Sequence, residues 1–439
     1  MNKTTLVTMA LMVGAASLTQ AAQQDGAALQ QNALQQSTAQ PGTAQQSAEK
    51  FNFCRWAGDA LTLFDAERDH AENPFIQEFK LKFRGQWQVS ALDPAGGTDR
   101  LKGASYGRDR AWNNEWRRFR IGAEAKVLKN FTVFANFNIG GLDGRETFDA
   151  TTGDWSSSDT EGVLDELFIQ GKFDPVTFTI GKHKPAFIGE YRTSSSKIIT
   201  IERSALVNQL TAEKTWGISF KNSDSKARFG WEAGLWLNGY HDGTWAEPAF
   251  TTADNAMLGL SVNYALNDDN RLYLDYMHSF VREGRENIGY AGPGARDVVA
   301  LTWEARQGRF NMMTEAMAGF NVLGSDGRNE GSENVFGLTI MPSYRITDHF
   351  EAVLRYQIAC GSNGIESDKR YYATNSAYSQ TSDLLHGVYM GVNYYVCPSN
   401  PHMMKVMLGA EYLNSHGTDA RGEKGFTGWS FTTAFRVNF

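Results

Sequence analysis

The 439-residue chain has only ten prolines and three cysteines, no surplus of basic residues and no long apolar run beyond its N-terminus. The net charge of −7 argues against a protein that binds nucleic acid, because such proteins carry a basic surface. No segment after the N-terminus has 18 consecutive apolar residues, which argues against a transmembrane helix in the mature chain. What remains is a chain with 43 glycines, 12% aromatics and no cofactor-binding motif.

The N-terminus predicts three segments ahead of the main domain. Residues 1–21 combine Lys3, an apolar run over Leu6–Leu18 and a small-residue cleavage site, which is typical of a secretory signal peptide; a short buried helix is the alternative. Residues 22–50 are rich in Gln and Ala and predict a flexible leader, or else a short helix. Residues 51–75 predict an N-terminal periplasmic segment that is a small plug, a coiled-coil remnant or a plain linker.

From residue 76 to residue 439 the chain repeats one pattern, in which apolar and polar residues alternate. This period of two indicates strands with one apolar face and one polar face. Most of these strands have roughly the 9–11 residues that a tilted strand needs to cross a bilayer. About sixteen are predicted, at Ile76–Val89, Arg117–Val127, Phe131–Ile139, Asp165–Phe173, Val176–Lys182, Trp216–Lys221, Arg228–Asn238, Met257–Leu266, Arg271–Phe280, Val298–Ala305, Phe310–Phe320, Val335–Tyr344, Phe350–Ala359, Leu384–Tyr395, Met404–Leu413 and Phe431–Phe439.

The connections between these strands alternate between short and long. Two-residue turns such as Asp174–Pro175 alternate with polar stretches such as Gly140–Gly162. Short periplasmic turns and long outer loops are typical of outer-membrane barrels, whereas a soluble sandwich gives no reason for strict alternation. We therefore expect an all-β fold: a transmembrane, antiparallel, up-and-down β-barrel of about sixteen strands, located in the bacterial outer membrane and bounded by its lipid.

A barrel of this width leaves an aqueous channel, so the polar face of each strand lines water. Cations predominate on the first strands, and carboxylates become more common from the middle strands onward. The predicted channel-lining cations are Lys80, Lys82, Arg84, Arg118, Arg120 and Lys172.

The third long loop, His183–Thr215, differs from the others. It contains apolar residues such as Phe187 and Ile201 among its cations. We expect it to fold into the barrel, pack its apolar residues on the wall and present its cations to the remaining water, where they would concentrate anions. The predicted anion-binding residues of this constriction are Lys182, Lys184, Arg192, Lys197 and Arg203.

Around this loop the chain resembles the phosphate-selective porin O and P family. The matching stretches are GKHKP from Gly181, the ERS triplet at Glu202–Ser204, WRRFRIG from Trp116 and LDELFIQGKFD over Leu164–Asp174. The resemblance implies sixteen strands, a homotrimer and passive uptake of anions such as phosphate past Arg117, Arg118, Arg120, Lys182, Lys184 and Arg203. The arginine ladder typical of the family's phosphate channels is not recognisable here, so a general porin of low selectivity remains an alternative.

Two further classes are weighed against a channel. Ser194–Lys197 matches a Ser-x-x-Lys acylation motif but lacks its usual partner motifs, which argues against an enzyme. A surface binding protein plugged by its loops is the second alternative. Among the cysteines, Cys360 and Cys397 fall at opposite ends of the barrel, whereas Cys54 of the periplasmic segment could reach Cys397.

Overall fold

The computed structural model describes residues 53–70, 73–95, 112–139, 146–148, 155–157, 163–237, 256–280, 292–323, 333–366, 381–417 and 425–439. The expected signal peptide and leader lie outside these residues. Among the described residues, no helix is long and apolar enough to cross a membrane.

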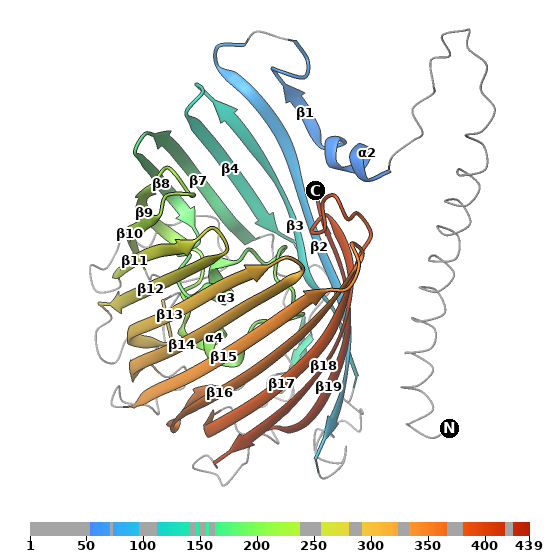
Figure 1. Cartoon of the computed structure of the whole chain (residues 1–439), viewed down its shortest axis with the longest axis vertical. Helices are drawn as coiled ribbons and strands as arrows, with labels where there is room; N and C mark the ends of the chain where they lie inside the picture. The colour runs from blue at the N-terminus through green and yellow to red at the C-terminus, as the bar shows by residue number, and fades with distance from the viewer. Residues whose placement is uncertain are drawn as a thin grey trace, which may run out of the picture. The chain divides into compact units, whose positions relative to one another are not determined.

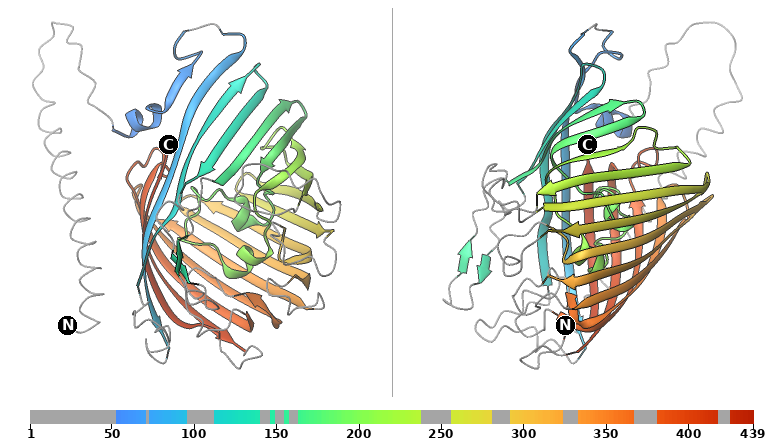
Figure 2. Two further views of the ribbon diagram at one scale, coloured as in Figure 1. Left: turned by 180° about the vertical axis from the view of Figure 1, so that it is seen from behind. Right: turned by 90° about the vertical axis from the view of Figure 1, so that its left-hand side faces the viewer.

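Sixteen antiparallel strands form a closed barrel (Figures 1 and 2), in which the last strand pairs with the first. Every predicted strand is present, so the expected fold is confirmed. The barrel strands are β2 (Ile76–Pro94), β3 (Trp112–Val127), β4 (Phe131–Asn138), β7 (Val163–Phe173), β8 (Val176–His183), β9 (Thr215–Asn222), β10 (Phe229–Leu237), β11 (Ala256–Asn267), β12 (Asn270–Ser279), β13 (Ala295–Gln307), β14 (Phe310–Val322), β15 (Asn334–Arg345), β16 (Phe350–Glu366), β17 (Thr381–Tyr395), β18 (Met404–His416) and β19 (Thr427–Asn438). A separate hairpin pairs β5 (Glu146–Phe148) with β6 (Trp155–Ser157).

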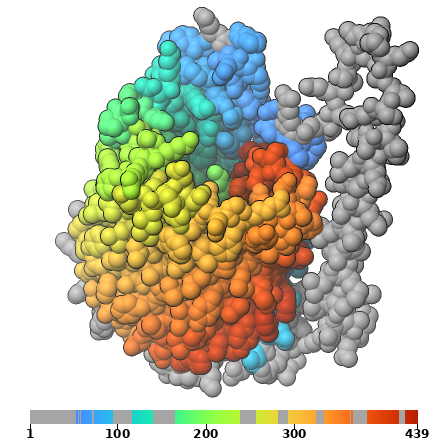
Figure 3. Space-filling view, viewed as in Figure 1, coloured from blue at the N-terminus to red at the C-terminus, as the bar shows by residue number. Residues whose placement is uncertain are grey.

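The outer face of the barrel is apolar because alternate residues of each strand point outward. Leu81, Ile121, Leu301 and Leu354 are 39–51% exposed on four different strands, although a soluble protein would bury such side chains. Figure 3 shows strands β11 to β17, yellow to orange, as a continuous outer surface. This surface suits the hydrocarbon of a bilayer.

Aromatic residues gather where the strands meet the short turns. Phe131 contacts Phe173 with ring centroids 5.5 Å apart, and Phe350 contacts Tyr394 at 5.0 Å. These pairs join neighbouring strands at the same end of the barrel. Such a band of aromatic side chains is typical of a membrane–water interface.

The N-terminal segment adds a short strand to the barrel wall. Helix α2 (Phe53–Asp59) leads into β1 (Thr62–Asp65), which pairs with β2 opposite Glu78–Lys80. Along the same edge of β2, Phe83 exchanges two backbone hydrogen bonds with Phe439, and the Leu81 N–H donates to Leu61 O. Strand β1 therefore continues the line of β19 beyond the C-terminus and pairs an edge that would otherwise be open.

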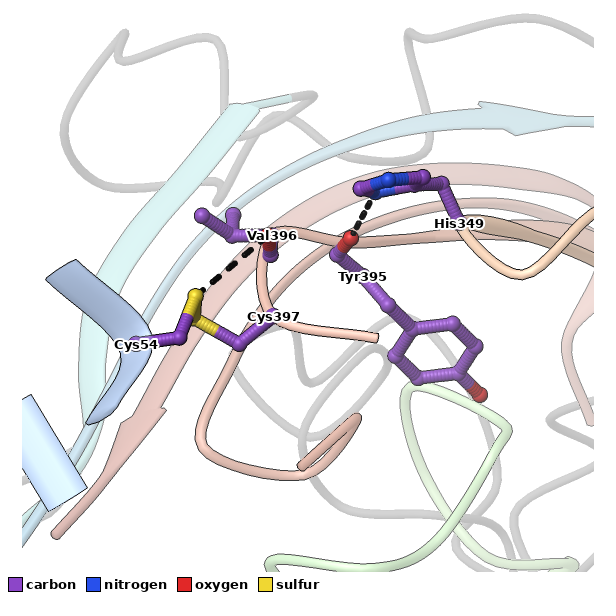
Figure 4. The surroundings of a disulfide bond; sticks show 5 residues. All are labelled: Cys54, His349, Tyr395, Val396 and Cys397. Atoms are coloured by element: carbon purple, nitrogen blue, oxygen red, sulfur yellow. Dashed lines mark hydrogen bonds between the residues drawn. A yellow bond between two sulfur atoms is a disulfide. The ribbon is translucent and has the colours of Figure 1, made fainter. Parts of the chain in front are cut away.

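A disulfide ties this segment to the barrel (Figure 4). Cys54 of α2 is bonded to Cys397 of the β17–β18 turn, with 5.6 Å between their Cα atoms, so the pairing considered from the sequence is confirmed. The turn itself contacts the next one, because the His349 ring hydrogen-bonds Tyr395 O at 2.8 Å. Cys360 is a free, exposed thiol.

The interior of the barrel contains residues 184–214, the connection between β8 and β9. This segment, called the inner loop below, holds the short helices α3 (Gly189–Arg192) and α4 (Ala205–Leu210). Both helices lie inside the ring of strands in Figures 1 and 2. The expectation of an inward-folded third long loop is confirmed.

Candidate functional site: the inner loop and the channel wall

The inner loop is first held at α3, by carboxylates of the barrel wall. The Ile188 N–H donates to Asp275 Oδ2 of β12 at 2.9 Å, and the Gly189 and Glu190 N–H groups donate to Glu315 of β14 at 3.1 and 3.0 Å. These are the N–H groups that a helix start leaves without partners. Ile188 has a φ of 65°, a conformation that β-branched residues rarely adopt and that surrounding packing must impose.

Arg355 of β16 makes the second attachment. Its Nη1 donates to Glu190 Oε1 and to Glu202 O, both at 2.8 Å, and its Nη2 donates to Glu411 Oε1 of β18 at 2.9 Å. The side chain is 1% exposed. One buried arginine therefore joins two parts of the inner loop to two strands of the wall.

Wall donors on β17, β18 and β19 hold the extended segment after α3. Lys405 Nζ donates to Ile198 O at 2.6 Å, and Asn393 Nδ2 donates to Ile199 O at 2.8 Å. Arg436 donates to Ile198 O at 3.2 Å and also to Ile201 O. Backbone carbonyls of the inner loop therefore accept hydrogen bonds from buried wall side chains that have almost no contact with water.

A β-bulge on β3 brings two adjacent arginines to the inner loop. The cross-strand register pairs Gln86 with Arg118 and then Trp87 with Trp116, so Arg117 is the extra residue. Arg117 Nε donates to Glu202 Oε1 at 3.1 Å, and Arg118 Nη2 lies 3.8 Å from Glu202 Oε2. Without the bulge, alternate residues would point to opposite faces and only one arginine would reach this carboxylate.

Apolar contacts complete the attachment, and two wall glycines make room for them. Phe187 is fully buried against Trp236, with ring centroids 5.5 Å apart. A Cβ on Gly259 would lie 2.2 Å from the Phe187 ring, and one on Gly337 would lie 2.4 Å from Leu206 of α4. Neither position accepts a side chain without a shift of the loop.

Of the five cations predicted to bind anions, Lys182 lies on β8 and the other four lie on the inner loop, and their surroundings differ. Lys197 is exposed and has no ion-pair partner among the described residues, whereas Arg192 donates from Nη2 to both Asp275 oxygens at 2.7 and 2.6 Å. Lys182 Nζ donates to Leu164 O at 2.7 Å, and Lys184 Nζ donates to Tyr191 O and Thr193 O. Arg203 is 8% exposed and donates to Glu190 O and Thr193 O. Water therefore reaches Lys197 far more than Arg203, because backbone carbonyls of the loop occupy the guanidinium.

The predicted wall cations lie on β2, β3 and β7. Lys80 pairs with Glu78, Lys82 lies 3.5 Å from Glu124, and Lys172 is exposed near the short-turn end of β7. Closer to the loop, Arg84 Nη1 donates to Ser195 Oγ at 3.0 Å, Arg118 contacts Gln86 and Glu202, and Arg120 lies 3.3 Å from Asp165.

Several basic residues of the channel interior were not among the predicted site residues, and Lys214, Lys405 and His402 are three of them. Lys214 closes the inner loop and contacts Asp165 and Glu166, at 2.9 Å from Glu166 Oε2. Lys405 holds the loop carbonyl described above, and His402 lies in the β17–β18 turn. Lys405 could have been found from its inward position in the alternation of β18; the other two lie in connections, where no periodicity applies.

His402 lies close to several basic side chains. Burial, together with repulsion by Lys405, Lys197, Arg345 and Arg436, lowers the pKa of its imidazole from 6.5 to about 4. The ring lies 6.3 Å from that of Tyr395. His402 is therefore neutral at physiological pH.

Between the inner loop and the short turns lies a cavity of about 830 Å³, called the subloop cavity below. Arg192, Lys197 and Ile199 of the loop line one side of it. The opposite side is formed by strand ends of β13 to β17 and their turns. The wall residues used below are Glu304, Arg306, Met313, Met341, Arg345 and His402.

A barrel with a folded inner loop and an apolar outer face is the architecture of porins, and comparison of the sequence with protein families agrees. Residues 79–300, half of the chain, match the family described as phosphate-selective porin O and P. This chain belongs to that family. It is accordingly a multi-pass outer-membrane β-barrel that forms a channel.

Solved structures with the same fold come from several bacteria. The anion-selective porin from Comamonas acidovorans gives a TM-score of 0.51 at 10% identity, covering 82% of this chain and 99% of that chain. OmpF of Salmonella typhi in complex with daunomycin gives 0.53 at 12% identity, covering 82% and 98%. At these identities the likeness shows the fold alone. No curated protein matches the sequence significantly.

Proposed function

We propose that this porin passes small anions, phosphate among them, through the space that the inner loop leaves inside the barrel. The observation that carries the proposal is the position of Arg84 directly opposite Arg120 in the β2–β3 register. Two like charges opposite each other on neighbouring strands destabilise a sheet. On a wall that faces water, the same two charges produce a positive electrostatic potential that attracts anions.

A second pair of like charges supports the same function. Lys405 lies directly opposite Arg436 in the β18–β19 register. Together with Arg84 and Arg120, these residues concentrate positive charge on four consecutive strands, β18, β19, β2 and β3. Lys405 and Arg436 are buried and donate to loop carbonyls, so they act on a permeating anion through their electrostatic field and not by contact.

The carboxylates nearby are already neutralised by cations. Asp165 contacts both Arg120 and Lys214, and Glu166 contacts Lys214. Glu202 contacts Arg117 and Arg118. Arg84, by contrast, has no carboxylate partner among the residues that the structure describes, and the same holds for Lys197, so these two cations are proposed to meet the permeating anion first.

Phosphate block of the chloride current tests this function. In a planar bilayer bathed in chloride, added phosphate is expected to reduce the current, because phosphate would dwell at Arg84 and Lys197 through charge-assisted hydrogen bonds. The double variant Arg84→Gln/Lys197→Gln is expected to lose most of the block, and Lys172→Gln, near the short turns, is expected to keep it. A current that phosphate leaves unchanged would refute the anion-binding role.

A loop-plugged binding protein is the second candidate. It is favoured by the many attachments of the inner loop, which reach β12, β14, β16 to β19, β2 and β3. Under this alternative the bilayer shows no current until the loop is released. A general porin of low selectivity would instead conduct both signs of ion equally.

We further propose that the barrel assembles as a homotrimer embedded in outer-membrane lipid. Membership of the family and the exposed apolar face support this assembly. Light scattering of the detergent-solubilised protein, corrected for bound detergent, measures the protein mass. A mass of three chains is expected, and a mass of one chain would contradict the proposal.

A further inference from the structure

The subloop cavity has two kinds of wall. On one side Ile199 of the inner loop packs with Met313 and Met341, and these side chains belong to one apolar cluster. On the other side, at the ends of the strands, stand Arg306 and Arg345. A volume of about 830 Å³ lies within the range of small-molecule sites.

The cations of this cavity are less neutralised than its carboxylates. Arg192 and Arg309 have partners, Asp275 and Asp348. Lys197, Arg306 and Arg345 have no carboxylate within ion-pair distance among the described residues; Arg345 lies over the Tyr395 ring at 4.7 Å.

The carboxylates that line the same cavity are mostly engaged. Glu190 receives Arg355 at 2.8 Å, and Glu351 receives the Ser343 hydroxyl at 3.0 Å. Glu304 lies directly opposite Arg271 in the β12–β13 register. Basic side chains outnumber carboxylates in the lining, so its net charge is positive: five basic residues (Arg192, Lys197, Arg306, Arg309 and Arg345) stand against four acidic ones (Glu190, Glu304, Asp348 and Glu351).

Buried polar atoms without partners lie around the same cavity. Thr200 is 1% exposed, and its Oγ1 has no hydrogen-bond partner among the described residues; Arg192 Nη1 and His402 Nδ1 are likewise unpaired. All three residues line the subloop cavity. Buried polar atoms are rarely left unsatisfied, so these three leave hydrogen-bonding capacity beside the cavity.

We propose that the subloop cavity binds an organic anion, with its acidic group at Lys197, Arg306 and Arg345 and its apolar body against Ile199, Met313 and Met341. The proposal rests on the proposed function and names a substrate class for it. Arginine forks match carboxylate and phosphate ester oxygens, and methionine side chains adapt to apolar bodies of different shape. Inorganic phosphate would leave the apolar wall without a contact.

Calorimetry on the purified full-length protein in detergent tests this site with benzoate as the probe. Benzoate is expected to bind at least tenfold more tightly than inorganic phosphate, which lacks the apolar body, and than benzyl alcohol, which lacks the charge. Phenyl phosphate is measured as a second probe. The aromatic anion that binds more tightly, benzoate or phenyl phosphate, identifies whether the cavity prefers a carboxylate or a phosphate ester.

Variants assign the binding to this cavity. Lys197→Gln and Arg345→Gln are each expected to weaken benzoate binding about tenfold, as the loss of one charge-assisted contact does. Met313→Gln is expected to weaken benzoate and leave inorganic phosphate unchanged. Lys226→Gln, which removes a cation from the exposed β9–β10 turn, is the matched control, and melting midpoints check that each variant is folded.

Three results would overturn the site: no benzoate binding, equal binding of inorganic phosphate and benzoate, or benzoate binding that none of the cavity variants alters. Conductance of the same preparation separates the two proposals. If the protein conducts anions and binds no benzoate, the cavity site is refuted and the channel function is supported. If the protein binds benzoate and does not conduct, the channel function is refuted and the cavity site is supported.

Discussion

Arg355 of β16 and Glu190 of α3 form a buried ion pair inside the barrel, with 2.8 Å between Nη1 and Oε1. The same guanidinium reaches Glu411 at 2.9 Å, so one cation balances two carboxylates. Breaking such a pair costs more than forming it gains, because the partner is left charged and buried. The pair therefore commits the inner loop to one position on the wall.

Removing this cation tests how the inner loop is held. Arg355→Gln is expected to destabilise the protein by about 3–5 kcal/mol, because Glu190 and Glu411 remain as unpaired buried charges. The loosened loop is also expected to become a substrate for trypsin at Lys197. Melting in detergent and limited proteolysis measure the two effects. Arg306→Gln, which removes an arginine without a carboxylate partner among the described residues, is the control and should melt like the wild type.

The disulfide of the N-terminal segment gives a second prediction. Cys54→Ser/Cys397→Ser is expected to cost about 2–5 kcal/mol of stability and to free β1 from the edge of β2. Hydrogen exchange at the Leu81 amide, which donates to Leu61 O, reports the edge directly. Cys360→Ser, at the free exposed cysteine, controls for the loss of a thiol. Unchanged exchange at Leu81 in the double variant would show that β1 stays paired without the disulfide.

The pKa of His402 gives the stability a pH dependence. Burial holds this pKa at about 4 in the folded protein, against 6.5 for an exposed histidine. Between these values the unfolded chain binds the additional proton, so the stability from neutral His402 is present above pH 6.5 and is lost as the pH falls toward 4. Melting midpoints at pH 7 and pH 5 are expected to differ less in His402→Gln than in the wild type. An equal difference in both proteins would remove His402 as the cause.

Removing the negative charge of Glu202 tests whether the net charge of the barrel interior sets the ion selectivity. Glu202→Gln removes the carboxylate that Arg117 and Arg118 share, so the net charge of the interior rises by one. The ratio of anion to cation permeability is expected to rise, by about twofold or more, because fixed positive charge concentrates anions. Reversal potentials in a chloride gradient measure the ratio. Asp224→Asn, in the β9–β10 turn outside the interior, should leave the ratio as it is.

The sequence predicted the barrel because a period of two persists in every strand. The position of the inner loop also followed from sequence, since Phe187 and Ile201 are unusual in a solvated loop. Features that depend on the register between neighbouring strands could not be predicted. The bulge at Arg117 changes which residues face inward, and nothing in the alternation marks an extra residue of that kind.

The contacts that hold the inner loop on the wall could not be predicted from the sequence either. Lys405 and Arg436 bind the backbone carbonyls of Ile198 and Ile201, and a carbonyl has no signature in the residue type that carries it. For the same reason Arg203, which resembles a family cation, could not be recognised as a buried donor to Glu190 O and Thr193 O. Sequence identified the charges, and three-dimensional pairing decided which of them meet water.

The measurement that tests the account most directly is the reversal potential of single channels in a potassium chloride gradient, for the wild type and for Arg84→Gln/Lys197→Gln. We expect an anion-selective wild type and a double variant whose reversal potential moves toward zero, because two cations that have no carboxylate partner among the described residues are gone. An unselective wild type, or a double variant as anion-selective as the wild type, would contradict the claim that these residues form an anion-selecting constriction.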